Sequence, residues 1–553
     1  MRLAAKNSEW LALALALAAL ALLWSWWRDA QPVAVVDGPA TQLQCISYAP
    51  SGGRYRPQSP VTPAEIRRDL AVLAQRTGCV RTYTVSDGFD QVPAVARELG
   101  LEVILGAWIG RDAVHNEREV ALVIDVANRH RDTIRAIVVG NEVMLRHELP
   151  PDQLAALIRR VRDGTGLPAT YADVWGFWVK HRVLSEAVSF VTVHIIPYWD
   201  DDPVGIDEVI PYVDTLHTEM QRQFPGKEVL IGETGWPSAG RPRGANEPGR
   251  VNQARYVREF AALADQRGIR YNLIEAFDQP WKRVPEGTVG GHWGLYDIEA
   301  RVKFPWQGPV AEAPHGVAVA AWALGASVLA AIAGFFWGGA ARGRNALVLA
   351  AAAGLLVGIV ARQADDLLLG NATSLDWIAT LAVASAGWLA FGIAIVAVVR
   401  PEPARDPLPP LLTLVLLLAC AYVCLGLVFA GRHRDFPVWL FLPGALALSV
   451  TAATNATARA IALHRQRATE LLLLAAWLVA AGFLVPLQEG FQNGRSIGWG
   501  ALCVLMGSAL LLPLALQARQ HQRAAEHAGT RPAEAVQHHA DGADRDGEDG
   551  SRG

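Results

Sequence analysis

Apolar and polar positions follow two different patterns along the chain. In residues 31–314, short apolar runs alternate with segments in which apolar residues recur with the period of a helix. From Gly316 onward, long runs of Ala, Leu and Val are separated by short charged loops. The pattern predicts an α/β domain followed by an all-α polytopic membrane domain. A chain of 553 residues also exceeds one ordinary domain.

The first part contains eight β-rich runs with helical patterns between them. The runs are residues 43–49, 80–84, 103–107, 134–140, 169–172, 190–196, 229–232 and 271–277. Eight strands with intervening helices over roughly 270 residues are typical of a (β/α)8 TIM barrel. We assign this predicted barrel to residues 40–308. A doubly wound open sheet is the alternative, but no Gly-rich phosphate fingerprint follows the first run.

Eight apolar segments approach the roughly 20 residues that a helix needs to cross a bilayer. The first lies in residues 1–30 and ends in Trp24, Trp26 and Trp27, which suit the membrane interface. It is longer than the apolar region of roughly 7–15 residues in a secretory signal, so we predict an uncleaved transmembrane anchor. The others form a predicted seven-helix transmembrane domain at 315–518 and are residues 316–337, 345–361, 376–399, 408–430, 437–457, 468–487 and 497–517.

Loop charges predict the orientation of the membrane segments. If the N-terminus lies inside, the inside segments carry most of the Lys and Arg residues near the spans, as the positive-inside rule requires. The barrel then lies outside the cytoplasmic membrane. The polar tail, residues 519–553, lies inside and is predicted to be disordered. The Ala- and Arg-rich composition and the lack of a eukaryotic-style signal favour a bacterial inner membrane, with the barrel in the periplasm.

Neither the net charge nor the cysteine positions change the predicted domain organisation. A net charge of −3 at pH 7 gives no sign of a nucleic-acid partner. Cys45 and Cys79 begin neighbouring predicted strands, so a disulfide and a pair of free thiols are both compatible with the pattern. Cys420, Cys424 and Cys503 lie in apolar runs and are predicted to be packing residues, because Cys behaves as a small hydrophobe. No metal-ligand spacing stands out, so no metal or cofactor is predicted.

Two glutamates stand where a barrel enzyme places its chemistry. Glu142 follows the fourth β-rich run and Glu233 follows the seventh, and barrel enzymes work at the C-terminal ends of their strands. Glycosidic cleavage needs two carboxylates across one barrel mouth. One protonates the leaving oxygen, and the other attacks the anomeric carbon or activates water. We therefore predict that Glu142 and Glu233 are catalytic.

Two motifs surround these glutamates: Gly140-Asn-Glu142, and Gly-Glu-Thr-Gly-Trp-Pro-Ser at 232–238. Further matching segments are residues 80–83, 103–106, 197–199, 275–278, 281–282 and 292–295. Together, over residues 42–306, they resemble glycoside hydrolase family 17, the β-1,3-glucanase and glucanosyltransferase family. The resemblance implies Glu142 as acid/base and Glu233 as nucleophile of a retaining mechanism. It also implies that Asn141 hydrogen-bonds the sugar 2-hydroxyl and that Tyr198 lies near the nucleophile.

Other polar and aromatic residues in these segments are candidates for substrate binding. They are Arg81, Tyr83, His194, Trp236, Glu275, Asp278, Trp281, Lys282, His292 and Trp293. The resemblance implies polar contacts from Glu275 and Lys282. The three tryptophans are candidate sugar platforms, because aromatic faces stack on pyranose rings, and barrel packing is their alternative role. The two histidines have the same alternative.

A covalent glycosyl-enzyme can be released by water or by another sugar hydroxyl. A barrel tethered between membrane segments resembles bacterial membrane glucan synthases implicated in the β-1,6 linkages of β-(1,3),(1,6)-glucans. The predicted function is a membrane-anchored retaining β-glucan transglycosylase, with a β-1,3-glucanase and a glucan-binding or export module as alternatives. The expected partners are β-glucan, the lipid bilayer and a membrane glucan synthase, because the chain has no motif for polymerising activated sugars.

Overall fold

Eight parallel strands close into a barrel in the computed structural model, which describes residues 2–39, 42–52, 60–337, 339–400, 407–465 and 469–529. The strands are β1 (Ile46–Ser47), β2 (Cys79–Arg81), β3 (Glu102–Ala107), β4 (Ile134–Asn141), β5 (Ala169–Val174), β6 (Val191–His194), β7 (Val229–Thr234) and β8 (Arg270–Leu273). Each strand pairs with the next along the chain, and β8 returns to β1. The predicted TIM barrel is confirmed, and each predicted run overlaps one strand.

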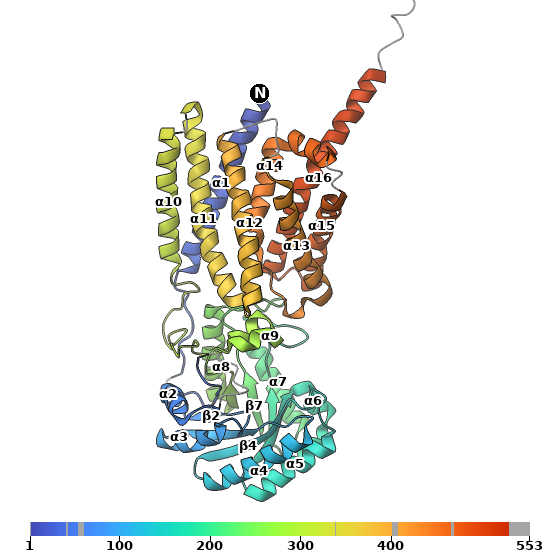
Figure 1. Ribbon diagram of the computed structural model, residues 1–553. Coiled ribbons are helices and arrows are strands. Elements are labelled where there is room, and N and C mark those ends of the chain that lie inside the picture. The colour runs from blue at the N-terminus through green and yellow to red at the C-terminus, as the bar shows by residue number, and fades with distance from the viewer. Residues whose placement is uncertain are drawn as a thin grey trace, which may run out of the picture.

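Helices connect the strands and surround the barrel (Figure 1). They are α2 (Pro63–Leu73), α3 (Val92–Glu98), α4 (Ala113–Arg129), α5 (Pro151–Thr165), α6 (Trp175–Lys180), α7 (Val209–Gln223) and α8 (Arg250–Arg267). Shorter helical turns are η1 (Phe89–Gln91), η2 (Arg182–Glu186), η3 (Pro280–Lys282), α9 (Arg283–Glu286) and η4 (Thr288–Gly291).

Local sequence explains why α2 begins and how it packs. Thr62 and Glu65 form a capping box, in which each side chain accepts a hydrogen bond from the other residue's backbone N–H. Ile66, Leu70 and Leu73 recur with the helical period and are fully buried. Burying each of these side chains contributes about 1.5–3 kcal/mol. The same periodicity made the barrel helices predictable.

A disulfide joins Cys45, directly before β1, to Cys79, the first residue of β2. The two strands are neighbours in the barrel, with Ile46 in register with Val80. Of the two alternatives that the sequence left open, the structure therefore has the disulfide. Pairing of adjacent strands brings the two cysteines together.

The second part of the chain is a bundle of long apolar helices. With the N-terminal helix α1 (Arg2–Asp29), it comprises α10 (Gly316–Trp337), α11 (Arg342–Gly370), α12 (Ser374–Val399), α13 (Pro410–Ala430), α14 (Val438–Arg465), α15 (Thr469–Glu489) and α16 (Gly494–Gly529), with the turns η5 (Gly339–Ala341) and η6 (Gly431–His433). Among the described residues, seven of these helices are long and apolar enough to cross a membrane, and α14 has a shorter apolar stretch, Val438–Thr454.

Helix α1 is an integral part of the bundle and packs against α11. The Trp26 indole N–H donates to the carbonyl oxygen of Gly358 in α11 at 3.0 Å. Arg362 lies over the Trp26 ring at 3.8 Å and forms an ion pair with Asp29. A Cβ atom on Gly358 would lie 2.6 Å from Leu22, so the close approach of the two helices requires glycine there.

The last helix is longer than the sequence predicted. We expected a disordered tail from residue 519, but α16 continues to Gly529. Its final segment is rich in Ala, Gln and Arg, which have high helix propensity, so the helix extends past its apolar stretch. The remainder of the predicted tail, residues 530–553, lies outside the described residues.

The barrel lies at one end of the bundle, and the N-terminal end of α1 lies at the other (Figure 1). In the loop after β7, Arg241 forms an ion pair with Glu489 and donates to the carbonyl oxygen of Arg432 at 3.2 Å. The Asn493 side-chain amide donates to the carbonyl oxygen of Pro242 at 3.2 Å.

The segment after β8 contacts the bundle as well, and α9 lies between the two domains (Figure 1). Arg283 donates to the carbonyl oxygen of Leu368 at 2.8 Å, and the Thr288 hydroxyl donates to Asp435 at 3.2 Å. Because these loops leave the C-terminal ends of their strands, the catalytic face of the barrel is turned toward the bundle.

Candidate active site

The two predicted catalytic glutamates lie side by side at the mouth of the barrel. Glu142 directly follows β4, and Glu233 lies near the end of β7. A carboxylate oxygen of Glu142, one of Glu233 and a ring nitrogen of His194 all lie within 4.8 Å of one another. The Glu142 side chain is 23% exposed and the Glu233 side chain is 10% exposed. Both carboxylates are therefore confined by neighbouring groups.

A turn in the backbone directs Glu142 toward the barrel axis. Gly140 has φ +85°, and a Cβ atom there would lie 2.9 Å from Val143, so only glycine fits this position. Glu142 itself has φ +55°, a left-handed conformation that costs a non-glycine residue about 1–2 kcal/mol. Its N–H donates to the carbonyl oxygen of Ala172 in β5 at 2.8 Å. The hydrogen bond to the next strand holds the strained residue in place.

Glu233 is held by two buried donors from the second strand and its loop. The Tyr83 hydroxyl donates to Oε1 of Glu233 at 2.9 Å, and the Arg81 guanidinium lies 3.3 Å from the same oxygen. Arg81 also donates to Oδ1 of Asn141 at 2.6 Å. Burial, followed by the charge of Glu233, raises the pKa of Tyr83 well above its usual value, so the phenol remains a donor at neutral pH. These contacts fix the position of the Glu233 carboxylate.

His194, at the end of β6, lies between the two glutamates. Its Nδ1 atom is 2.9 Å from Oε1 of Glu142, and its Nε2 atom is 3.5 Å from Oε1 of Glu233. Burial opposes ionisation of Glu142, but the hydrogen bond and charge of His194, with the charges of Arg146 and Arg81, outweigh burial and lower the pKa of Glu142. His194 is therefore linked directly to the protonation of Glu142.

These three side chains are also arranged as a group that could hold a metal ion. The Arg81 guanidinium already pairs with Glu233 and places a positive charge beside that carboxylate. A cation between the two carboxylates would be repelled by this charge. The arrangement fits acid–base and nucleophilic chemistry by carboxylates better than metal binding.

Comparison with known proteins identifies the family of the barrel domain. Residues 45–294 match the BtgE/BtgC glycoside hydrolase domain. A glucan 1,3-beta-glucosidase of Schizosaccharomyces pombe is 31% identical over 230 residues, which are 39% of this chain and 72% of the relative. The chain belongs to glycoside hydrolase family 17. It is an enzyme of the glycoside hydrolase type.

Other relatives of this family 17 chain match a similar share of it. A glucan 1,3-beta-glucosidase of Candida albicans is 26% identical over 260 residues, which are 43% of this chain and 84% of the relative. A crystal structure of the family 17 β-1,3-glucanosyltransferase from Rhizomucor miehei is 25% identical, with a TM-score of 0.43, and covers 48% of this chain and 97% of that chain.

The segment after β8 contains several of the polar residues that were predicted to bind substrate. Lys282 donates to Oε2 of Glu275 at 2.7 Å, and Glu275 is almost fully buried. Burial lowers the pKa of Lys282, but the charges of Glu275 and Glu286 outweigh burial and raise it. The pair therefore brings a cation within electrostatic reach of Glu233.

Asp278 and His292 lie next to each other, and their contacts stabilise the segment after β8. Asp278 accepts hydrogen bonds from Lys303 at 2.7 Å and from the Gly294 N–H at 2.9 Å. Its other oxygen is 3.7 Å from Nδ1 of His292. Burial opposes ionisation of Asp278, but Lys303 and His292 together outweigh burial and lower the pKa of Asp278. These contacts join the ends of the segment and favour a structural role.

Three of the aromatic candidates are packed in the interior. Tyr198 was expected beside the nucleophile, but its hydroxyl donates to the carbonyl oxygen of Arg241 at 2.5 Å, and Tyr83 supplies the phenol next to Glu233. Trp236 was a candidate sugar platform, but it is fully buried and packs against Tyr256. Trp293 is 2% exposed and contacts the Tyr198 ring. These rings fill space beneath the loops and offer no face for stacking.

Trp281 is the predicted platform that retains partial exposure. Its indole N–H donates to Oε1 of Gln279 at 2.9 Å, and the Lys282 ammonium lies 5.9 Å from its ring centre. The ring is thus fixed beside the cationic end of the Glu275–Lys282 pair. It remains a candidate for contact with a sugar.

Sequence reasoning missed three residues around the site. Trp108 follows β3 and is 37% exposed, and the Arg146 guanidinium lies 4.5 Å from its ring centre. The rule that function gathers after strand ends would have found Trp108. Burial raises the pKa of Glu286 to about 7, and the charges of Glu275, Glu233 and Glu142 contribute to the rise. The spacing of Lys282 and Glu286, one helical turn apart, was the available signal.

Proposed function

We propose that the protein is a membrane-anchored, retaining β-glucan transglycosylase that acts on β-1,3-glucan and forms or remodels β-1,6 linkages. The observation that carries the mechanism is the separation of the two carboxylates, whose nearest oxygens lie within 4.8 Å of each other. Retaining glycosidases place their carboxyl groups about 5–5.5 Å apart, whereas inverting enzymes need about 6.5–9.5 Å for a water molecule. The short separation supports attack by a carboxylate.

In the first step, Glu142 as a carboxylic acid donates its proton to the glycosidic oxygen. The Glu233 carboxylate attacks the anomeric carbon, the bond to the leaving sugar breaks, and a glycosyl ester forms on Glu233. Arg81 and Tyr83 hold Glu233 for this attack, and their donors stabilise its charge before the bond forms. Asn141 binds the 2-hydroxyl of the donor sugar in this proposal, and the hydrogen bond that its oxygen accepts from Arg81 supports a fixed orientation of the amide.

In the second step, Glu142 acts as a base. It takes a proton from the incoming hydroxyl, whose oxygen attacks the anomeric carbon and releases Glu233 as a carboxylate. A sugar 6-hydroxyl as acceptor gives a β-1,6 linkage, and water gives hydrolysis. His194, bonded to Glu142, is in position to stabilise the ionised form that this step requires.

The arrangement of the two domains supports transfer to a glucan at the membrane. Loops after β7 and β8 contact the bundle through Arg241 and Arg283, so the catalytic face lies close to the ends of the membrane helices. A substrate that emerges from a membrane synthase would meet the site at this surface. The Cys45–Cys79 disulfide supports an oxidising compartment such as the periplasm.

Product analysis tests the reaction. Purified full-length protein in detergent is incubated with short β-1,3-glucan oligosaccharides, and the products are characterised by mass and linkage analysis. Transfer predicts products longer than the donor with 1,6-linkages. Shorter products of retained anomeric configuration would identify a β-1,3-glucanase, and no turnover would favour a glucan-binding or export module.

Reporter fusions test the orientation. A reporter joined after Pro314, next to the barrel, should be active in the periplasm. A reporter joined after Arg344, at the start of α11, should be active in the cytoplasm. The opposite result would place the barrel on the cytoplasmic side and overturn the proposed location.

A further inference from the structure

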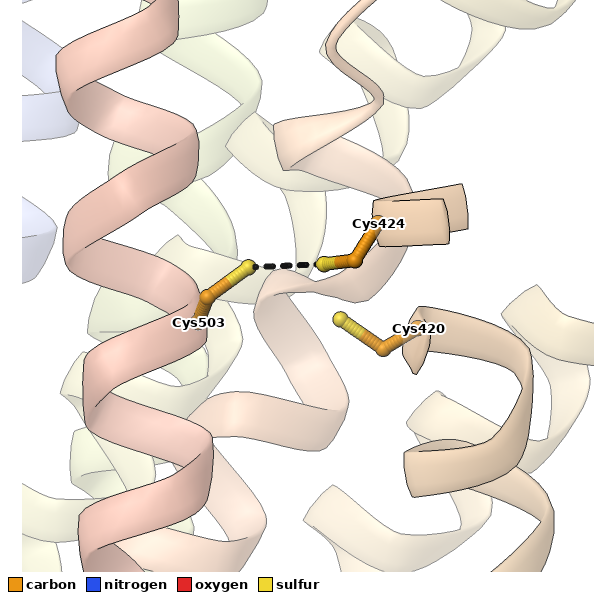
Figure 2. A group of neighbouring side chains, drawn as sticks. All are labelled: Cys420, Cys424 and Cys503. Carbon is orange, nitrogen blue, oxygen red and sulfur yellow. Dashed lines mark hydrogen bonds between the residues drawn. The ribbon is translucent and has the colours of Figure 1, made fainter. Parts of the chain in front are cut away.

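Three free cysteines, which the sequence analysis treated as separate packing residues, converge inside the bundle. Cys420 and Cys424 are one helical turn apart on α13, and Cys503 faces them from α16 (Figure 2). Their sulfur atoms all lie within 4.8 Å of one another, and the Cys424 and Cys503 sulfurs are 3.5 Å apart. All three side chains are fully buried. We call these residues the thiol cluster.

We propose that the thiol cluster binds one soft monovalent metal ion of the Cu(I) class. Metal–sulfur bonds of about 2.3 Å in a trigonal arrangement place the three sulfurs about 4 Å apart, close to the observed spacing. Thiolate sulfur selects Cu(I) and Zn(II) among common metals. A structural Zn(II) site takes four ligands, whereas the group found among the described residues supplies three. Three sulfurs without a fourth donor fit Cu(I).

A second observation points to a ligand at this place. The indole N–H of Trp499, one turn before Cys503 on α16, is fully buried and has no conventional hydrogen-bond acceptor in the described part of the chain. Trp499 and Cys503 are four residues apart on α16, so they lie on the same face of the helix. A sulfur that carries negative charge on binding a metal accepts such a hydrogen bond far better than a neutral thiol does.

Protons must leave the site when the metal binds. Cysteine coordinates a metal as the thiolate, so each sulfur that binds the Cu(I) ion releases one proton. The positive charge of the ion at their centre partly offsets the negative charge of the thiolates. At 1.5 Å per residue, Cys424 lies about 9 Å along the axis from the end of α13, in the half of the bundle nearer the barrel.

The metal would clamp the two helices that present bundle segments to the barrel. Helix α13 leads directly into η6, whose His433 ring lies 5.9 Å from the Trp199 ring of the barrel. Helix α16 begins just after Asn493, which donates to the Pro242 carbonyl oxygen. A bond from α13 to α16 through the metal therefore stabilises the contact surface next to the catalytic face.

Titration of the full-length protein with Cu(I) tests this site. The reduced protein in detergent is titrated anaerobically against the coloured Cu(I) complex of bicinchoninate, and the C424A/C503A variant is the matched control. The other cysteines of the chain, Cys45 and Cys79, remain in both proteins. We expect the wild type to withdraw one Cu(I) per chain with at least tenfold higher affinity than the variant. Equal withdrawal by the two proteins would overturn the proposal.

Two further measurements keep the result decisive. If the double variant does not fold, Trp499→Phe, which removes the N–H but retains the apolar ring, should weaken Cu(I) binding several-fold. Unchanged affinity would then contradict the site. Cu(I) should also raise the thermal midpoint of the wild type, because a ligand of the folded state stabilises it. Binding of Zn(II) but not Cu(I) would refute the assignment to a monovalent ion.

Discussion

The barrel and the bundle hold their buried residues in place by different means. At the barrel mouth, buried polar side chains pair with the carboxylates: Arg81 donates to Glu233, and Nδ1 of His194 is hydrogen-bonded to Glu142. In the bundle, close packing depends on small residues: a Cβ atom on Gly500 would lie 2.4 Å from the Gly482 carbonyl oxygen. Buried polar groups in the barrel need hydrogen-bond or ion-pair partners. In the bundle, glycines have no side chain, so the helix backbones can approach each other closely.

This contrast predicts that the largest effect on activity comes from the barrel network. Glu233→Gln removes the nucleophilic carboxylate but keeps the size of the side chain, so turnover of β-1,3-glucan oligosaccharides should fall at least about 10³-fold. The thermal midpoint should stay close to that of the wild type. Steady-state kinetics and thermal unfolding of the same preparation check both statements, and full residual turnover would remove Glu233 as nucleophile.

The next effect concerns the joint between the two regions. Arg241→Met leaves Glu489 without its partner in a mostly buried place, and breaking such a pair costs about 3 kcal/mol. The thermal midpoint of the full-length protein should fall. Adding Glu489→Gln to this variant should restore part of the loss, because the unpaired charge disappears. If the two changes are additive, the ion pair does not couple the domains.

A larger side chain at the contact between α15 and α16 tests the packing of the bundle without changing the barrel. Gly500→Leu should destabilise the packing of α15 against α16 by about 2 kcal/mol, whereas the activity of the protein that remains folded should be unchanged. Gly392→Leu, in α12, is the matched control, because no atom lies within 4 Å of a Cβ at that position. Detergent-solubilised protein is compared by its thermal midpoint. Equal loss in both variants would show that close helix approach is not the cause.

The smallest effect is a change in pH dependence. His194→Leu removes the donor that lowers the pKa of Glu142, so this pKa should rise. Glu142 must be protonated to act as acid, and the acid form would then persist to higher pH. The alkaline limb of kcat/KM should therefore shift upward. His217→Leu, whose histidine is bonded to Val229 on the outer side of the barrel, should leave the limb in place.

Periodicity and strand-end motifs predicted much of the protein. The helical spacing of apolar residues in α2 and the apolar runs of the strands show which face of each element is buried. This pattern is local in the sequence, so it can be read without the structure. Glu142 and Glu233 were predictable because a barrel brings the ends of all its strands together. The direction of an aromatic side chain is different, because packing against distant residues decides it. The sequence alone therefore could not show whether Trp236 and Trp293 are exposed to a sugar or packed in the interior.

The sequence by itself determined the barrel, the apolar helices and the two carboxylates, since each follows from periodicity or from position after a strand. Only the tertiary structure decided which groups surround them. It placed Tyr83 instead of Tyr198 on Glu233, joined Cys45 to Cys79, and turned the catalytic face toward the bundle. It also brought Cys503 to Cys424 across two helices. Such contacts join residues far apart in sequence, and packing of the whole chain decides which of them meet.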